Sequence, residues 1–167
     1  DLLFLSNKRQ IGWAKSVVES VLYLLWDLKF KVGYSSRTIS DCVQLGLDDL
    51  TIRTSMLEKR YLCGSIDLFE ELETTLKKKV FSKKASNFVE GKLSERAERH
   101  LKHANARYML EPNIKEGKGG LRDLHTLYWI SKYIYKTDNI QSLVEKKIFK
   151  KSELQIFTEA ENFLWFI

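Results

Sequence analysis

The sequence has 167 residues, 44% of them apolar, and its formal net charge is +6. A chain of that length can bury one ordinary core or two small ones. Its two cysteines lack metal-binding or redox spacing, which excludes a disulfide-dependent scaffold and favours the cytoplasm. The basic charge favours phosphate-bearing or acidic partners, and the longest apolar run, residues 21–26, is too short for the roughly 20 residues that cross a membrane.

The first eighty residues predict strands alternating with helices. Asp1 opens an apolar strand with no preceding cap or methionine, so we expect the chain to be a fragment. Thr38 or Ser40 can cap a short helix, and Asp67 and Glu70 have capping-box spacing. In chain order the predicted elements are a strand at 1–5, a helix at 13–28, a strand at 29–39, a helix ending at 47, a strand at 55–64 and a helix at 67–81.

Beyond residue 81 the sequence predicts helices only. A charged, helix-favouring stretch at 86–109 is interrupted by a loop at 110–120, and an apolar helix follows at 121–136. Two further helices are predicted at 140–148 and 153–166. The fold class is therefore α+β, with a mixed part over 1–80 and a helical part over 81–167.

Two acidic residues are candidate metal ligands. Asp1 starts the first predicted strand, and Glu58 falls within the strand predicted up to residue 64. Carboxylates on neighbouring strands can share Mg²⁺, which binds one or two carboxylates together with substrate phosphates. On spacing alone, a plainer interpretation carries more weight: Glu58 is one charge of a solvated run and Asp1 is a frayed terminus.

The loop at 110–120 is a candidate anion site. It contains the only proline and three of the eight glycines, immediately before the apolar helix. Glycines permit exposed backbone N–H groups, and a helix N-terminus beside them attracts anions. A solvated connection between two helices explains the loop equally well. The candidate phosphate contacts are Lys115, Lys118, Gly119, Gly120 and Arg122.

Within this loop we expect different roles for neighbouring residues. Lys115 is the expected phosphate contact, and Asp123 is expected to pin the flanking helices together. For Arg122 the sequence does not decide between these two roles. The three histidines are too scattered to predict a metal site. The four tryptophans lie in apolar helical patterns that are typical of a core.

The stretch at 99–132, "RHLKHANARYMLEPNIKEGKGGLRDLHTLYWISK", resembles the bacterial PII-protein uridylyltransferases of the GlnD type. Residues Glu111 to Asp123 match the family pattern E-P-N-x-K-E-x-x-G-G-L-R-D. Residues 1–5 are similar to the end of the family's Asp-x-Asp strand, and residues 49–65 to the segment with its third carboxylate. The resemblance covers nearly the whole chain.

The resemblance implies an incomplete polymerase-β-like nucleotidyltransferase core, a mixed sheet with helices over 1–80, followed by a helical domain over 81–167. It implies that Asp1 is the second aspartate and Glu58 the third acid of a Mg²⁺ site. In this family the metal ions bind UTP, activate a tyrosine hydroxyl of PII and stabilise the leaving pyrophosphate. The glycine loop would then lie beside the nucleotide. We therefore expect UTP and PII as partners, and neither nucleic acid nor membrane.

Three departures from the family qualify this interpretation. The first aspartate with its glycine-rich turn, and the His-Asp and ACT domains, are not in the sequence, so we expect the chain to be inactive alone. Lys118 stands where many members carry proline. The alternatives are a protein like the adenylyltransferase of glutamine synthetase, another signalling nucleotidyltransferase, or a basic helical binding module without chemistry.

Overall fold

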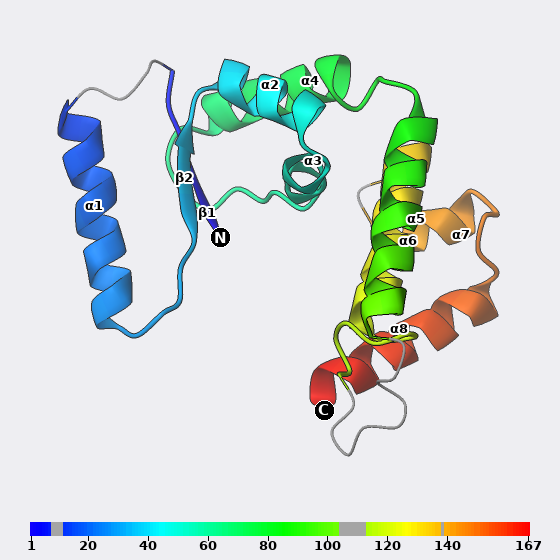
Figure 1. Ribbon diagram of the computed structural model, residues 1–167. Coiled ribbons are helices and arrows are strands. Elements are labelled where there is room, and N and C mark those ends of the chain that lie inside the picture. The colour runs from blue at the N-terminus through cyan, green and yellow to red at the C-terminus, as the bar shows by residue number, and fades with distance from the viewer. Residues whose placement is uncertain (8–11, 104–112, 138) are drawn as a thin grey trace. The chain divides into compact units, whose positions relative to one another are not determined.

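The computed structural model describes residues 1–7, 12–103, 113–137 and 139–167. The chain divides into two compact units, residues 1–83 and residues 84–167 (Figure 1). Because the positions of these units relative to each other are not determined, each is described by itself.

In its described residues the first unit has two short parallel strands and four helices. Leu2 pairs with Tyr34 and Leu5 with Arg37, so α1 forms the connection between β1 and β2 (Figure 1). The α+β class is confirmed, but a sheet of two parallel strands among the described residues does not establish the expected mixed sheet of a nucleotidyltransferase core. The elements are β1 (Leu2–Leu5), α1 (Gly12–Asp27), β2 (Tyr34–Arg37), α2 (Ile39–Asp48), α3 (Leu50–Leu57) and α4 (Ile66–Lys79).

Local capping sets where the helices of the first unit begin. Thr38 and Asp41 form a reciprocal capping box at α2, which confirms the predicted cap. Asp49 caps α3 by accepting from the N–H of Ile52 at 2.7 Å. The side chain of Ser65, rather than Asp67, accepts from the N–H of Leu68, so the capping box predicted for α4 is wrong.

The strand predicted at 55–64 is also wrong. Residues Leu50–Leu57 form α3, with Thr54, Met56 and Leu57 buried, and Glu58 is the residue that ends this helix. Burial of one helical face and the Asp49 cap outweigh the β-branched composition. Glu58 therefore does not lie on a strand beside Asp1.

The core of the first unit forms where α2 meets α3 and α4. Burial in this core raises the pKa of the Cys42 thiol, because the thiolate loses its hydration. The most deeply buried apolar residues here are Cys42, Met56, Leu72, Leu76 and Val80.

Helix α1 packs less of its surface than its sequence pattern predicts. Of the helix, only Val18 and Leu22 are buried. Trp13 is 78% exposed and Trp26 42% exposed, and Trp165 in the second unit is 67% exposed. The prediction that the tryptophans lie in the core is therefore wrong for these three side chains.

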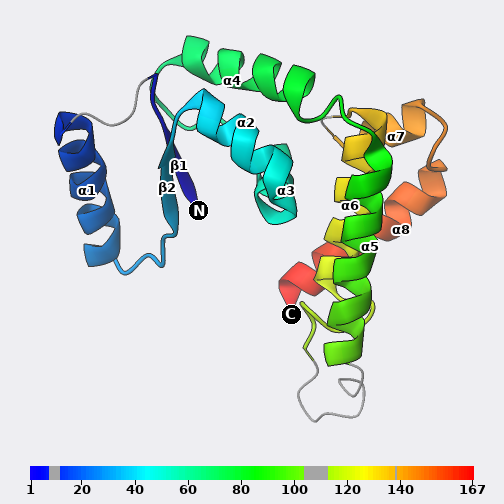
Figure 2. The same ribbon diagram turned by 45° about the horizontal axis from the view of Figure 1, so that its top comes forward.

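The described residues of the second unit form helices and the turns that connect them, without a strand, as predicted. Helices α5 and α6 lie side by side (Figure 2), and the rings of Phe88 and Tyr133 stack between them with centroids 4.2 Å apart. Residues 104–109 of the predicted long helix lie outside the described residues. The helices are α5 (Ala85–Lys102), α6 (Leu121–Tyr135), α7 (Gln141–Glu145) and α8 (Lys151–Phe166).

A nearly buried lysine lies beside the aromatic pair. Lys92 is 3% exposed, and its Nζ lies 2.7 Å from the carboxylate of Glu95 and 5.3 Å from the ring centre of Trp129. The carboxylate and the ring face together offset the desolvation of the ammonium. This arrangement gives the interface between α5 and α6 a polar as well as an apolar component.

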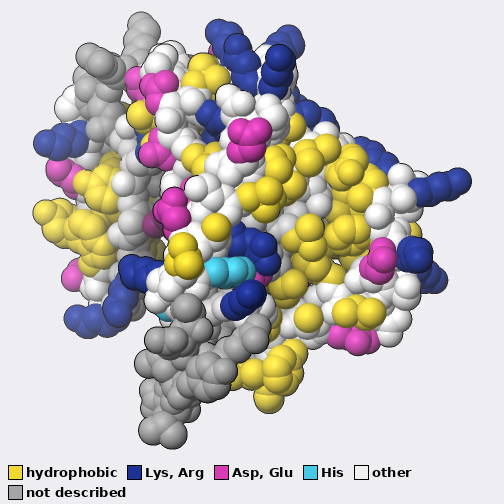
Figure 3. All heavy atoms as spheres, turned by 45° about the vertical axis from the view of Figure 1, so that its right-hand side comes forward, with side chains coloured by type: hydrophobic (Ala, Val, Ile, Leu, Met, Phe, Trp, Pro, Cys, Tyr) yellow, Lys and Arg dark blue, Asp and Glu magenta, His cyan; other side chains and the backbone are white. Residues whose placement is uncertain are grey.

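Large apolar side chains also remain exposed in the second unit. Figure 3 shows hydrophobic atoms over a broad part of one face, bordered by Lys and Arg side chains. Among the described residues, no helix is both long and apolar enough to cross a bilayer. The exposed apolar side chains of α6 and α8 are Leu127, Ile134, Tyr135, Ile156, Phe163, Trp165 and Phe166.

Candidate functional site

The turn at residues 113–120 is closed by its own hydrogen bonds. The side-chain oxygen of Asn113 accepts from the N–H groups of Lys115 and Glu116 at 3.1 and 2.8 Å. The carbonyl of Asn113 accepts from the N–H of Gly117, whose carbonyl accepts from Gly120. Asn113 therefore nucleates the turn, in the manner of asparagines that bond the backbone a few residues ahead. Glu111 and Pro112 lie outside the described residues.

The turn also occupies the N–H groups at the start of α6. The N–H of Leu121 donates to the carbonyl of Ile114, and that of Arg122 to the carbonyl of Lys115, both at 3.0 Å. Normally such groups are open at a helix N-terminus. Because the N–H of Gly120 is also taken, the expectation of exposed backbone donors at these positions is wrong. The N–H groups of Gly120, Leu121 and Arg122 are therefore not available to an anion in this structure.

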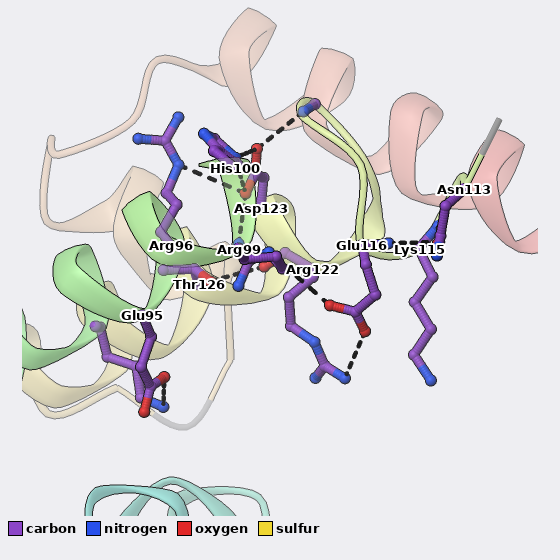
Figure 4. Close-up of polar contacts among 12 residues, drawn as sticks. Glu95, Arg96, Arg99, His100, Asn113, Lys115, Glu116, Arg122, Asp123 and Thr126 are labelled. Atoms are coloured by element: carbon purple, nitrogen blue, oxygen red, sulfur yellow. Dashed lines mark hydrogen bonds and ion pairs between the residues drawn. The ribbon is translucent and has the colours of Figure 1, made fainter. Parts of the chain in front are cut away.

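Asp123 is the centre of a polar cluster, here called the Asp123 cluster, that comprises Asp123, Arg96, Arg99, His100 and the N–H of Gly119. Its carboxylate lies 2.6 Å from Nη2 of Arg99, 2.8 Å from Nε2 of His100 and 3.5 Å from Nε of Arg96. The N–H of Gly119 donates to the same carboxylate at 2.9 Å. Figure 4 shows the three side chains of α5 converging on Asp123. The prediction that Asp123 pins the two helices is confirmed.

The environment of Asp123 favours the ionised carboxylate. Burial by itself raises the pKa of this group, but the hydrogen bonds from Gly119, Arg99 and His100 outweigh burial and hold the pKa below its usual value. The carboxylate is therefore ionised at neutral pH. Its side chain is only 12% exposed.

A second carboxylate extends the cluster toward the glycine turn. Glu116 lies 3.4 Å from Nη2 of Arg122 and 3.9 Å from Nε of Arg99, a buried nitrogen with no hydrogen-bond partner among the described residues. The guanidinium of Arg122 also lies over the ring of Trp129, 5.6 Å from its centre. Arg122 is thus engaged with groups of its own chain, which favours the structural role for this residue.

Lys115 and Lys118 are the exposed cations of the loop. Both residues are exposed, and in Figure 4 the side chain of Lys115 extends away from the Asp123 cluster. Gly119 has a φ of +81° and open space around it, whereas a Cβ on Gly120 would lie 2.4 Å from the carbonyl oxygen of Ile114. Both glycines therefore shape the turn, one through its backbone angle and the other through close packing.

The two candidate metal ligands lie in the first unit. Asp1 precedes β1, and its carboxylate lies against Gly33, where an added Cβ would meet the Asp1 oxygen at 2.3 Å. Glu58 is exposed at the end of α3. Both supply the hard oxygen ligands that Mg²⁺ prefers. Across the described residues, however, no group of three or more potential metal-binding side chains gathers, so these two acids alone do not make a complete metal centre.

Sequence reasoning missed the partners of Asp123 on α5. The spacing of the three histidines predicts no shared site, yet the ring nitrogen of His100 lies within hydrogen-bonding distance of a carboxylate 23 residues later. Arg99 contacts the same group 24 residues away. The available signal was the helical register: residues 96, 99 and 100 are spaced three and four apart, which places them on one face of α5.

Comparison with known proteins shows what the chain is similar to. Residues 87–167 match the family described as GlnD PII-uridylyltransferase. The chain is 53% identical over 165 residues to a bifunctional uridylyltransferase/uridylyl-removing enzyme of Ruegeria pomeroyi, and 50% identical over 165 residues to a protein of the same name from Cereibacter sphaeroides. Each alignment covers 99% of this chain but 18% of the relative. No solved structure matches the chain.

Proposed function

Because the chain belongs to the GlnD family of PII-uridylyltransferases, we propose that the protein transfers a uridylyl group from UTP to a tyrosine of a PII protein. The observation that carries the proposal is the identity of about half of all residues with two uridylyltransferase/uridylyl-removing enzymes along 99% of the chain. This chain spans 18% of the length of either relative, and the proposed activity is that of the full-length protein.

In this proposal Asp1 and Glu58 contribute carboxylate oxygens to bound Mg²⁺. Such an ion neutralises the triphosphate and stabilises the leaving pyrophosphate. Both side chains carry the hard oxygens that this ion needs, and both belong to exposed residues. Further ligands must come from the nucleotide phosphates and from residues beyond this pair.

The exposed lysines of the glycine turn would contact the nucleotide phosphates. Lys115 and Lys118 belong to the turn that Asn113 nucleates, and neither has an ion pair with another described residue. Gly119 and Gly120 give the turn its shape. Arg122, which pairs with Glu116 and covers Trp129, is assigned to holding the turn on α6.

Replacement of Glu58 by glutamine tests the proposed activity. In the full-length protein with UTP, Mg²⁺ and a PII protein, Glu58→Gln should lower kcat by about two orders of magnitude or more, because an uncharged amide is a poor Mg²⁺ ligand. Glu70→Gln, the same change at an exposed position of α4, should leave kcat unchanged. Labelling of the PII tyrosine by radioactive UTP measures kcat for both variants.

Two results of this experiment count against different parts of the proposal. If the unaltered protein labels no PII tyrosine, the proposed transfer reaction is wrong. If Glu58→Gln retains the unaltered rate while the protein is active, only the assignment of Glu58 as a metal ligand is wrong.

A further inference from the structure

We propose that Asp123, with Arg99 and His100 of α5, positions the turn that carries Lys115 and Lys118, and that none of the three touches the nucleotide. This inference rests on the proposed function only in giving the two lysines a phosphate to bind. The positioning itself follows from contacts within the described residues.

One carboxylate joins three separate segments of the chain. Asp123 lies in the first turn of α6, accepts from the N–H of Gly119 in the glycine turn, and binds Arg99 and His100 of α5. Because α5 and α6 also pack through the Phe88 and Tyr133 rings, the carboxylate is held on a rigid support. A turn tied to that support cannot change shape without losing a charge-assisted hydrogen bond.

Gly119 is the position where such a tie is needed. Its φ of +81° lies in a region open to glycine, and no atom lies within 4 Å of where a Cβ would stand. No neighbour therefore packs against the Cβ side of this residue, and a glycine has access to more backbone conformations than any other residue. The hydrogen bond to Asp123 supplies the missing restraint, directly beside Lys118.

Asp123 itself is unsuited to contact a nucleotide. Its side chain is 12% exposed, and both oxygens are occupied by groups of its own chain. A carboxylate facing a triphosphate would also repel it. Its effect on nucleotide binding must therefore pass through the turn.

The charges around Asp123 keep it ionised and held in place. Arg96, Arg99 and His100 face it from α5, while Glu116 of the turn and Arg122 of α6 complete the surroundings. Arg99 bridges the two carboxylates, since Nη2 contacts Asp123 and Nε lies 3.9 Å from Glu116. Loss of either Arg99 or His100 removes a donor from the carboxylate that holds Gly119.

The test compares Asp123→Asn with the unaltered full-length protein. We expect KM for UTP to rise by about tenfold or more, as loss of a charge-assisted hydrogen bond allows, while kcat changes by less than about threefold. Hydrogen exchange in a peptide covering residues 113–121, followed by mass spectrometry, should become faster. The control variant Glu98→Gln, at an exposed position of the same helix α5, should change neither KM nor the hydrogen exchange of this peptide.

A pair of variants at His100 tests the inference independently of Asp123. Glutamine can still donate an N–H to the carboxylate, so His100→Gln should retain a nearly unaltered KM, whereas His100→Leu should raise it. This pair also carries the test if Asp123→Asn does not fold. Equal KM values for the two His100 variants would contradict the positioning role.

The two measurements separate this inference from the proposed function. A raised KM with unchanged exchange would mean that Asp123 acts on the nucleotide directly, and a lowered kcat with unchanged KM would place it in the chemical step. Either result overturns the inference. Faster exchange with unchanged KM would show that Asp123 holds the turn but that the turn does not affect UTP binding. That result overturns the link to the lysines. Absence of any transfer by the unaltered protein overturns the proposed function alone.

Discussion

The α-carbon of Gly120 lies so close to Ile114 that a Cβ would stand 2.4 Å from the carbonyl oxygen of Ile114. This carbonyl also accepts the N–H of Leu121, so it cannot move away without breaking the bond that starts α6. Gly120→Ala should therefore lower the free energy of unfolding by roughly 2 to 3 kcal/mol. A Cβ at Gly119 has open space around it, so only the positive φ opposes the substitution. Gly119→Ala should therefore lower the free energy of unfolding by about 1 kcal/mol. Urea unfolding of both variants checks the order, and a smaller loss for Gly120→Ala would contradict it.

Truncation of Phe88 should strongly destabilise the second unit. Its ring is fully buried and stacks on Tyr133 with an interplanar angle of 9°. Phe88→Ala leaves a cavity between α5 and α6 and should cost about 3 to 5 kcal/mol. Leu93→Ala on the same helix, at a side chain 47% exposed, should cost less than about 0.5 kcal/mol. Thermal unfolding of the two variants provides the comparison.

The stabilising effect of Asp123 should depend on pH in one direction. Since its folded pKa is held below the usual value of 3.8, its contribution is fully present above the unfolded pKa and is lost as pH falls through the folded pKa. Asp123→Ala should therefore cost roughly 2 to 4 kcal/mol at pH 7, with the difference from the unaltered protein shrinking below about pH 4. Urea unfolding between pH 3 and pH 7 measures this difference. A difference that grows in acid would contradict the assignment.

Loss of Lys115 should weaken nucleotide binding without loss of stability. Its exposed side chain extends away from the Asp123 cluster, so Lys115→Ala removes no internal ion pair of the cluster. UTP affinity of the full-length protein should fall by about 1.5 to 3 kcal/mol. Lys78→Ala, at an exposed position of α4, is the matched control. Titration calorimetry with thermal unfolding separates the two effects, and unchanged affinity in both Lys115→Ala and Lys118→Ala would rule out phosphate contacts by the turn.

A methyl group at Gly33 should disturb the proposed metal site rather than the fold. The Cβ would meet the Asp1 carboxylate at 2.3 Å, a side chain that can turn aside. We expect Gly33→Ala to change the melting temperature little and to raise several-fold the Mg²⁺ concentration needed for half-maximal activity. An unchanged Mg²⁺ requirement would argue against Asp1 as a ligand.

Much of the helical second unit could be predicted from sequence because its signals are local. The apolar period of α6 and the turn residues before it lie within one short stretch, and the role of Asp123 followed from its place there. The partners of Asp123 could not be predicted in the same way. Arg99 and His100 precede it by 24 and 23 residues, and helix packing rather than local pattern brings them together.

The strand wrongly predicted at 55–64, where α3 ends, has a different physical origin. Isoleucine and threonines in Leu50–Leu57 favour strands, but the Asp49 cap and burial of Thr54, Met56 and Leu57 on neighbouring elements decide for a helix. The same composition predicts a strand at Glu58, which in the structure is the residue that ends α3. Its position relative to Asp1 is a tertiary property that propensity does not encode.

The parallel pairing of β1 with β2 has a consequence for how the first unit folds. Leu2 pairs with Tyr34, so the sheet brings together two residues that are 32 positions apart in sequence, with all of α1 between them. Parallel strands cannot pair through a tight turn, and the entropy of closing such a loop must be overcome before any strand hydrogen bond forms. A helix formed early in that loop shortens it, because each helical residue advances the chain by only about 1.5 Å. The speed at which the two strands meet is therefore set by the helicity of α1, a segment that contributes few buried side chains to the finished unit.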